Sequence, residues 1–337
     1  GQHGKRKAVD SPKVYPEDDP SASEQTEIIQ ANIKEFIGQE PKLFQEFFDE
    51  ELDDQTKKSM LDTPEEHCGE CDAMVVMKML TGLGVQGGDQ LIANILWVRA
   101  ETRAIHRNAM LQAKYYHSRK GKTNPLEKLP ESKSFVPVKK INGVVQHVLI
   151  TGNPGTGKTV KIHYLVYRAL CYGASVGVVV EKTRAVILHP DPNKCKVFDK
   201  IEIEKCSEAL RMLNNCAFVI GDSRNRVDKF PMWLEGLIME TFLIVINSPR
   251  RDEIRKFRAF ALTFFSSTST MEESKGQWEL LRHQNKVSNE NSLPNWFPNR
   301  FSLIQDRYRK IGGAARWLFS IDQVFEIRFA ELKKECR

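Results

Sequence analysis

The chain of 337 residues contains no uninterrupted run of 18 apolar residues, and this absence excludes a membrane-spanning helix. Its first residues, Gly-Gln-His-Gly-Lys-Arg-Lys, are polar, so no secretory leader is expected there. We therefore expect an intracellular location and no membrane partner. Lys5-Arg6-Lys7 is a short candidate for a nuclear-import signal, although three basic residues are equally typical of a solvated tail.

A disulfide framework is also absent. The seven cysteines are odd in number and dispersed, which favours a reducing compartment. One close pair, Cys68 and Cys71, has the spacing of half a zinc site. No second pair with zinc-like spacing follows, so two reduced thiols are the favoured interpretation.

Basic residues are scarce over residues 15–72, and this segment and residues 73–337 have net charges of opposite sign. Residues 15–72 carry 18 acidic and 4 basic side chains, a net charge of −14, whereas residues 73–337 carry 25 acidic and 42 basic side chains, a net charge of +17. The acidic segment could bind the basic part, recruit a protein partner, or be a solvated tail.

The most informative motif is a glycine-rich loop with the pattern G-x-x-x-x-G-K-T, the P-loop or Walker A motif. Its glycines allow backbone conformations that side chains would block, and its N–H groups point at phosphate. Lys158 is expected to reach the β- and γ-phosphates of ATP, and the Thr159 hydroxyl to bind Mg²⁺. The residues predicted to bind the nucleotide are Gly152, Asn153, Pro154, Gly155, Thr156, Gly157, Lys158 and Thr159.

The surroundings of the motif fit a strand, a loop and a helix. Residues 144–151 are rich in β-branched residues, and apolar residues at helical spacing follow over 158–172. Because this context is the one that a true P-loop needs, a chance match in a glycine-rich turn is disfavoured.

A second acidic group for Mg²⁺ is predicted at Asp222, which ends the apolar strand 216–221 in a Walker-B-like position. An Asp that caps a turn is the alternative. Ser223 follows it, where many ATPases carry a Glu that polarises the attacking water. The sequence therefore predicts slow hydrolysis rather than rapid turnover. Glu181, at the end of another strand, could substitute or be an ordinary strand-end charge.

Further candidates follow the next strand and lie near the end of the chain. Asn247 or Ser248 could sense the γ-phosphate, and Arg250 or Arg251 could stabilise phosphoryl charge. Arg316 comes after a Gly-Gly pair and could face the nucleotide. A polar turn and exposed arginines are the alternatives in each case.

The expected fold class is α/β: a P-loop NTPase with a parallel sheet, helices on both faces, a helical N-terminal region and a helical C-terminal subdomain. We divide the chain into a disordered tail (1–23), an acidic-then-basic helical region (24–117), a linker (118–139), the α/β core (140–250) and the C-terminal subdomain (251–337). Expected strands are 144–151, 175–181, 185–189, 195–198, 216–221 and 242–247. Expected helices are 24–37, 73–82, 90–117, 158–172, 204–214, 229–239, 301–309 and 314–319, with a further helical segment at 278–281.

The helix predicted over 90–117 is basic, with Arg99, Arg103, Arg107 and Lys114 along it. A basic helix can bind the phosphates of nucleic acid, although a solvated face is the commoner reason for such charge.

Several motifs in this order resemble the NTPase domain of Crinkler effectors and retrotransposon hot spot proteins, which are AAA-like or STAND-like P-loop ATPases. The resemblance covers residues 140–325 and implies ATP binding, oligomerisation and action in the nucleus. The Leu-Phe-Leu-Ala-Lys-type targeting motif of Crinklers is absent, so secretion as an effector has no support. The motifs are the P-loop, Gly221-Asp222, Asn247-Ser248-Pro249, Phe264-Phe265 with a Ser/Thr-rich stretch and Glu272-Glu273, and Tyr308 before Gly312-Gly313 and Arg316-Trp317.

The leading hypothesis is an ATP-dependent molecular switch with slow ATPase activity and Mg²⁺ as its metal. GTP is disfavoured because no N-K-x-D base-recognition motif follows the strands. A nucleic-acid-associated ATPase or motor is the second hypothesis. The third is a non-enzymatic interaction module that holds ATP for structural reasons.

Overall fold

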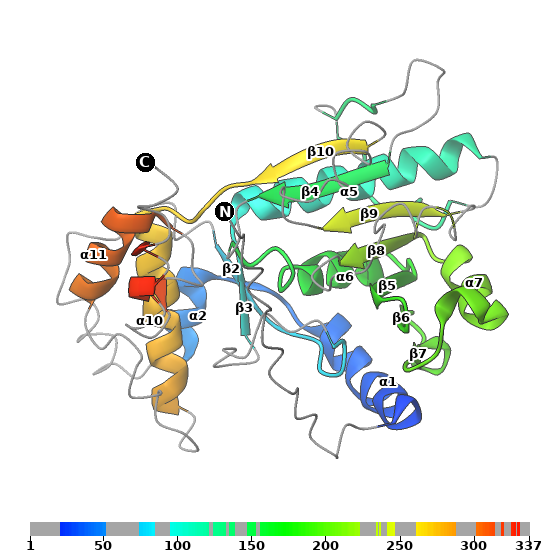
Figure 1. Cartoon of the computed structure of the whole chain (residues 1–337), viewed down its shortest axis with the longest axis horizontal. Coiled ribbons are helices and arrows are strands. Elements are labelled where there is room, and N and C mark those ends of the chain that lie inside the picture. Colours follow the sequence, from blue (N-terminus) through cyan, green and yellow to red (C-terminus); the bar gives the residue numbers. More distant parts are fainter. Residues whose placement is uncertain are drawn as a thin grey trace, which may run out of the picture.

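The computed structural model describes residues 21–51, 74–84, 95–120, 124–132, 135–138, 147–152, 156–222, 234, 236, 241–246, 261–287, 301–313, 318–319, 325–327 and 329–330. In Figure 1 the large sheet and the helices packed on it lie in the right part of the view. The helices α10 and α11 lie at the left, with β2 and β3 between the two groups.

Seven strands of the described residues form the large sheet in the order β10-β4-β9-β8-β5-β6-β7. The five strands from β10 to β5 are parallel, and β6 and β7 pair antiparallel at one edge. The expected all-parallel sheet is therefore corrected to a mostly parallel one. The strands are β4 (His147–Gly152), β5 (Val176–Glu181), β6 (Arg184–Leu188), β7 (Lys196–Phe198), β8 (Phe218–Asp222), β9 (Phe242–Ile246) and β10 (Ala261–Ser266).

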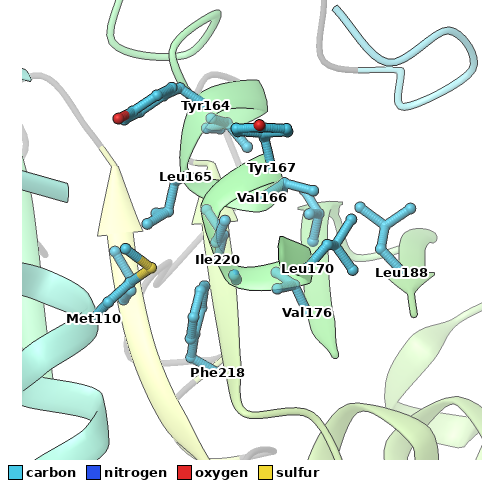
Figure 2. Close-up of a cluster of buried hydrophobic side chains, with 14 of the residues drawn as sticks. Met110, Tyr164, Leu165, Val166, Tyr167, Leu170, Val176, Leu188, Phe218 and Ile220 are labelled. Atoms are coloured by element: carbon cyan, nitrogen blue, oxygen red, sulfur yellow. The ribbon is translucent and has the colours of Figure 1, made fainter. Parts of the chain in front are cut away.

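The central strands are buried on both faces, which explains why they read as continuous apolar runs. Alternate residues enter two separate cores because side chains alternate along a strand. Phe218 and Ile220 pack against α5 (Ala100–Arg119) and α6 (Ile162–Cys171), whereas Val219 packs against α7 (Ser207–Asn214). Figure 2 shows the first core, in which Met110 of α5 and Leu165 of α6 gather around β8.

The acidic N-terminal helix α1 (Ala22–Gly38) is docked on this body. Its Ile29, Ile33 and Phe36 lie in the first core. The Thr26 hydroxyl accepts a hydrogen bond of 3.0 Å from the backbone N–H of Val197 in the edge strand β7. An unpaired edge is a site for unwanted pairing, so α1 satisfies and covers part of it. Ser21 and Glu24 form a capping box, and the helix begins two residues before the predicted start.

A second body is built around a small sheet from segments that are far apart in the sequence. The small sheet has the order β1-β2-β3, with antiparallel β1 (Lys42–Leu43), β2 (Val75–Lys78) and β3 (Ile95–Val98) within the described residues. Leu280 of α10 (Met271–Val287) packs with Phe44 of α2 (Phe44–Glu51) and with β2. Ile304 of α11 (Phe301–Ile311) packs against α10.

Three predicted elements are wrong. Residues 75–78 and 95–98, predicted as parts of helices, form β2 and β3, because each short apolar run pairs with the other across the sheet. The C-terminal region, predicted as helical from 251, contains β10, which adds to the edge of the large sheet beside β4. Pairing with a distant strand determines that these segments form strands, because periodicity over four to six residues does not distinguish a strand from a helix.

The other predicted elements agree in type where the described residues cover them, but only Leu318 and Phe319 of the helix predicted over 314–319 are described. The helix predicted over 158–172 starts later, at Ile162, after a turn that contains the loop lysine. Only Leu234 and Gly236 of the helix predicted over 229–239 are described. No helix in the described part of the chain has the length and apolar character needed to cross a membrane.

Candidate functional site

The glycine-rich loop starts where β4 ends, at the carboxyl edge of the parallel strands. Gly152 has a φ of 154° and Gly157 a φ of 72°, conformations that favour glycine. A Cβ on Gly152 would overlap the backbone oxygen of Ser266 in β10, so the two backbones are in direct contact. Both glycines therefore have a structural reason to be glycine, and Gly152 ties the loop to the strand beside it.

Lys158 lies half-buried inside this loop. Its ammonium donates hydrogen bonds to the backbone oxygen of Gly152 at 2.8 Å and to the hydroxyl of Thr156 at 3.2 Å. These contacts hold the positive charge over the loop backbone, in the turn that leads into α6. Because a helix start favours anions, the ammonium and the helix dipole attract negative charge to the same place.

The side chains of Thr159 and Asp222 are in contact at the carboxyl edge of the sheet. The Thr159 hydroxyl donates to the Asp222 carboxylate at 3.5 Å, and Asp222 is only 1% exposed. Hydroxyl and carboxylate oxygens are hard ligands of the kind that Mg²⁺ prefers, and adjacent ligands of octahedral Mg²⁺ are about 3 Å apart. The pair therefore fits the predicted metal. No group of three or more His, Cys, Asp or Glu side chains suited to a metal occurs in the described residues.

The topology places a third strand end between these two groups. β9 lies between β4 and β8, and its last residue, Ile246, is in register with Asp222. The end of β9 at Ile246 thus lies between the strand end that leads to the loop lysine and the strand end that carries Asp222.

A buried polar cluster lies beside the loop. Lys161, one turn after Lys158, is 5% exposed. Burial, and then the charge of Arg99, lower the pKa of Lys161 to about 8, while Glu101 and Glu273 act in the opposite direction. The Arg99 guanidinium donates to the Glu273 carboxylate at 2.7 Å and pairs with Glu101 at 3.1 Å.

Sequence reasoning missed this cluster. Arg99 was assigned to an exposed basic helix, but it precedes α5 and is 5% exposed. The signal that could have found its partner is Thr270-x-x-Glu273, a capping box that places Glu273 in the first turn of a helix. That pattern predicts the start of α10 but not the partner of Glu273, which lies 174 residues away.

The structure brings together six of the predicted site residues: Gly152, Thr156, Gly157, Lys158, Thr159 and Asp222. The others lie outside the described residues: Asn153, Pro154, Gly155, Asn247, Ser248, Arg250 and Arg316. Cys68 and Cys71 lie outside them as well.

The basic helix differs from its prediction. Arg99 and His106 are buried, and Lys114 donates to the backbone oxygens of Glu127 and Leu129 at 3.1 and 2.6 Å. Met110 and its neighbours on α5 pack against the large sheet. The basic residues on this helix therefore do not form one exposed stripe.

Comparisons with known proteins add little. No protein-family model matches the chain, and no curated protein matches it. Among solved structures, the RuvB Holliday junction branch migration motor of Thermotoga maritima matches with a TM-score of 0.28 and 14% identity, over 57% of this chain and 63% of that chain. The match covers less than two thirds of that protein. The resemblance to Crinkler and retrotransposon hot spot proteins stays a prediction from the motifs.

Proposed function

We propose that the chain is an ATP-binding P-loop NTPase that works as a molecular switch with slow hydrolysis. The observation that carries the proposal is the arrangement at the ends of β4 and β8. Lys158 lies inside a glycine loop that opens a helix, and Thr159 and Asp222 lie 3.5 Å apart beside it. A phosphate cradle and an adjacent pair of hard oxygen ligands are what Mg²⁺-ATP requires.

Each group has a defined role in this proposal. The backbone N–H groups of the glycine loop and the Lys158 ammonium bind phosphate oxygens, for which the ammonium exchanges its bonds to Gly152 and Thr156. Thr159 and Asp222 would hold Mg²⁺, which supplies positive charge against the phosphates. Ser223 at the position after Asp222 carries no carboxylate, and this supports slow turnover.

The finer assignments belong to the same proposal. Asn247 or Ser248 would sense the γ-phosphate, because β9 ends between β4 and β8. Arg250, which follows β9 in the sequence, and Arg316, which follows the Gly312-Gly313 pair, would respond to the nucleotide state. Self-association and a nuclear location are what the resemblance to Crinkler and retrotransposon hot spot ATPases implies.

The direct test replaces the loop lysine. Lys158→Ala should weaken binding of Mg²⁺-ATP by about 100-fold, because several charge-assisted hydrogen bonds to phosphate are lost together. Isothermal titration measures the change. Lys194→Ala, at a lysine that is 64% exposed and paired with Asp191, is the matched control and should bind normally. Normal affinity in Lys158→Ala would refute the phosphate assignment.

A second variant isolates the metal ligands. Asp222→Asn keeps the size of the side chain but removes its charge. We expect ATP affinity to lose most of its dependence on Mg²⁺ in this variant, while affinity measured without Mg²⁺ changes little. An unchanged magnesium dependence would place the metal elsewhere.

The two other candidate functions are separated by turnover measurements. The nucleic-acid hypothesis began from a basic helix, but Arg99 and His106 are buried, so its basic residues form no single exposed stripe for phosphate. The interaction-module hypothesis predicts tight ATP binding with no measurable hydrolysis. Release of phosphate that disappears in Lys158→Ala supports the switch over the module.

A further inference from the structure

A short serine- and threonine-rich segment links the glycine loop to the second body. This segment, Ser266–Thr270, begins at the last residue of β10 and leads into α10, and it is called the serine loop below. Its first residue is in register with Gly152, and the close backbone contact there leaves no room for a Cβ on the glycine. A movement of the loop backbone at Gly152 must therefore be accompanied by a movement of Ser266.

Arg99 and Glu101 together hold Ser267, the next residue of the serine loop. The guanidinium donates to the backbone oxygen of Ser267 at 3.0 Å and to its hydroxyl at 3.2 Å. Glu101 accepts from the backbone N–H of Ser267 at 3.1 Å and from its hydroxyl at 2.8 Å. The same guanidinium binds Glu273 in the first turn of α10. One buried arginine thus joins the start of α5, the serine loop and α10.

The far end of the serine loop is fixed to the turn after α11. The backbone N–H of Ser269 donates to the backbone oxygen of Gly313 at 3.0 Å, and the hydroxyl of Tyr308 donates to the backbone oxygen of Ser269 at 3.2 Å. A Cβ on Gly313 would overlap that same oxygen, so the contact is again between two backbones. Gln277 of α10 donates to the Ser269 hydroxyl at 2.9 Å.

We propose that Arg99 is a positioning residue that couples occupancy of the glycine loop to the placement of α10 and α11 through the serine loop. The proposal rests on the proposed function, because phosphate binding is the event that would start the change. To reach phosphate, the Lys158 ammonium gives up its bond to the backbone oxygen of Gly152, the residue in contact with Ser266.

The geometry requires an arginine. Arg99 uses its ε nitrogen for Glu273 and its two terminal nitrogens for Ser267, a planar fork that lysine cannot reproduce. Arg99→Lys therefore keeps the charge next to Glu273 and removes the simultaneous contacts. Ser267 is exposed, so Ser267→Ala removes the bonds of its hydroxyl to Arg99 and Glu101 without opening the core.

The experiment measures ATP affinity and amide hydrogen exchange in the same samples of the full chain, with and without Mg²⁺-ATP. In the wild-type protein, ATP should slow exchange in α11 by about fivefold or more. Arg99→Lys and Ser267→Ala should bind ATP within about threefold of wild type and lose at least half of the slowing in α11. Arg119→Lys, at an exposed arginine of α5 that binds Tyr115, is the matched control and should respond as wild type does.

The outcomes separate the coupling from the proposed function. If both variants bind ATP and show the full slowing in α11, Arg99 does not couple the two sites, and the ATP-binding function stands. The same conclusion follows if the wild-type protein binds ATP without any change in α11, or if Arg119→Lys loses the response equally. If the wild-type protein binds no ATP, the proposed function falls and the coupling falls with it. Should Arg99→Lys unfold, Ser267→Ala alone decides.

Discussion

The body around the large sheet and the body around the small sheet are assembled in different ways. Strands β4 to β10 of the large sheet lie within residues 147–266, and its two cores are formed mostly by elements of that stretch with α1 and α5. The small-sheet body instead packs Leu280 of α10 against Phe44 and Met74, more than 200 residues earlier in the chain. Contacts at such separations have a higher entropic cost of closure.

This difference teaches where stability should reside. In the large sheet, the side chains of Phe218, Ile220 and Val245 are fully buried. In the small sheet, Ile95 and Trp97 are only partly buried and pack on smaller clusters, whereas Leu96 and Val98 are buried in the core that also contains Phe218. We expect the large-sheet body to be the more stable unit and the small-sheet body to open first, since local stability follows the density of buried apolar contacts.

The largest expected effects come from truncating one core residue in each body. Phe218→Ala should lower the free energy of unfolding by about 4 kcal/mol, and Leu280→Ala by about 3 kcal/mol, because both side chains are fully buried. Phe218→Ala should destabilise the whole chain. Leu280→Ala should raise hydrogen exchange in α10 and α11 while protection of β8 and β9 persists.

Equal loss of protection in both bodies for Leu280→Ala would mean that they unfold as one cooperative unit. The comparison would then describe assembly along the chain and not stability. Phe265→Ala, at a side chain that is 59% exposed at the end of β10, is a control that should change stability much less.

A smaller effect is expected at the junction, where two adjacent glycines differ. Gly313→Ala should lower the free energy of unfolding by about 3 kcal/mol, since the added carbon overlaps the backbone of Ser269. Gly312 has a φ of 74° with open space around it, so Gly312→Ala should cost about 1 kcal/mol. Chemical denaturation of the two variants measures the difference.

The pair tests whether backbone contact with Ser269 or local backbone conformation holds the second body in place. A larger cost for Gly312→Ala than for Gly313→Ala would contradict the tight contact. Equal ATP affinity of the two variants is expected, because neither glycine touches the glycine loop.

The same comparison explains how much could be predicted from the sequence. The central strands were predicted because strands buried on both faces are continuous apolar runs, such as Phe218–Asp222. Lys158 and Thr159 were predicted because the motif places all its groups within eight residues. Asp222 was predicted from its place at a strand end, which is a local feature as well.

The parts that were missed depend on partners far along the chain. The four residues of β2 have no periodicity of their own that separates strand from helix, and pairing with β3 decides their structure. Arg99 looked like one charge of a basic helix, and only the fold brings Glu273 to it. Sequence patterns report the neighbours within a turn or a strand, so a cluster that joins distant segments leaves no local signal.

A weaker effect than that of Gly313→Ala concerns acid, and it should separate the two bodies by their buried polar groups. His106 of α5 is 2% exposed, its Nδ1 has no hydrogen-bond partner among the described residues, and its ring stacks on Tyr164 at 5.9 Å between centroids. Burial, and then the positive charge of Lys161, lower the pKa of His106 to about 3. Arg307, in the small-sheet body, is 1% exposed and donates to the backbone oxygen of Leu318 at 2.8 Å.

The sign of the acid effect follows from the two pKa values of His106. Between pH 6.5 and 3 the unfolded chain binds the proton at His106 and the folded chain does not. The free energy of unfolding therefore decreases as the pH falls through this range. Going from pH 7 to pH 5 should cost about 2 kcal/mol through this residue. His106→Phe keeps the stacked ring and should remove that part of the acid sensitivity, as denaturation at the two pH values would show. Arg307→Met should change stability equally at both pH values. If His106→Phe loses as much stability as wild type between pH 7 and pH 5, the acid sensitivity has another source, and this contrast between the two bodies fails.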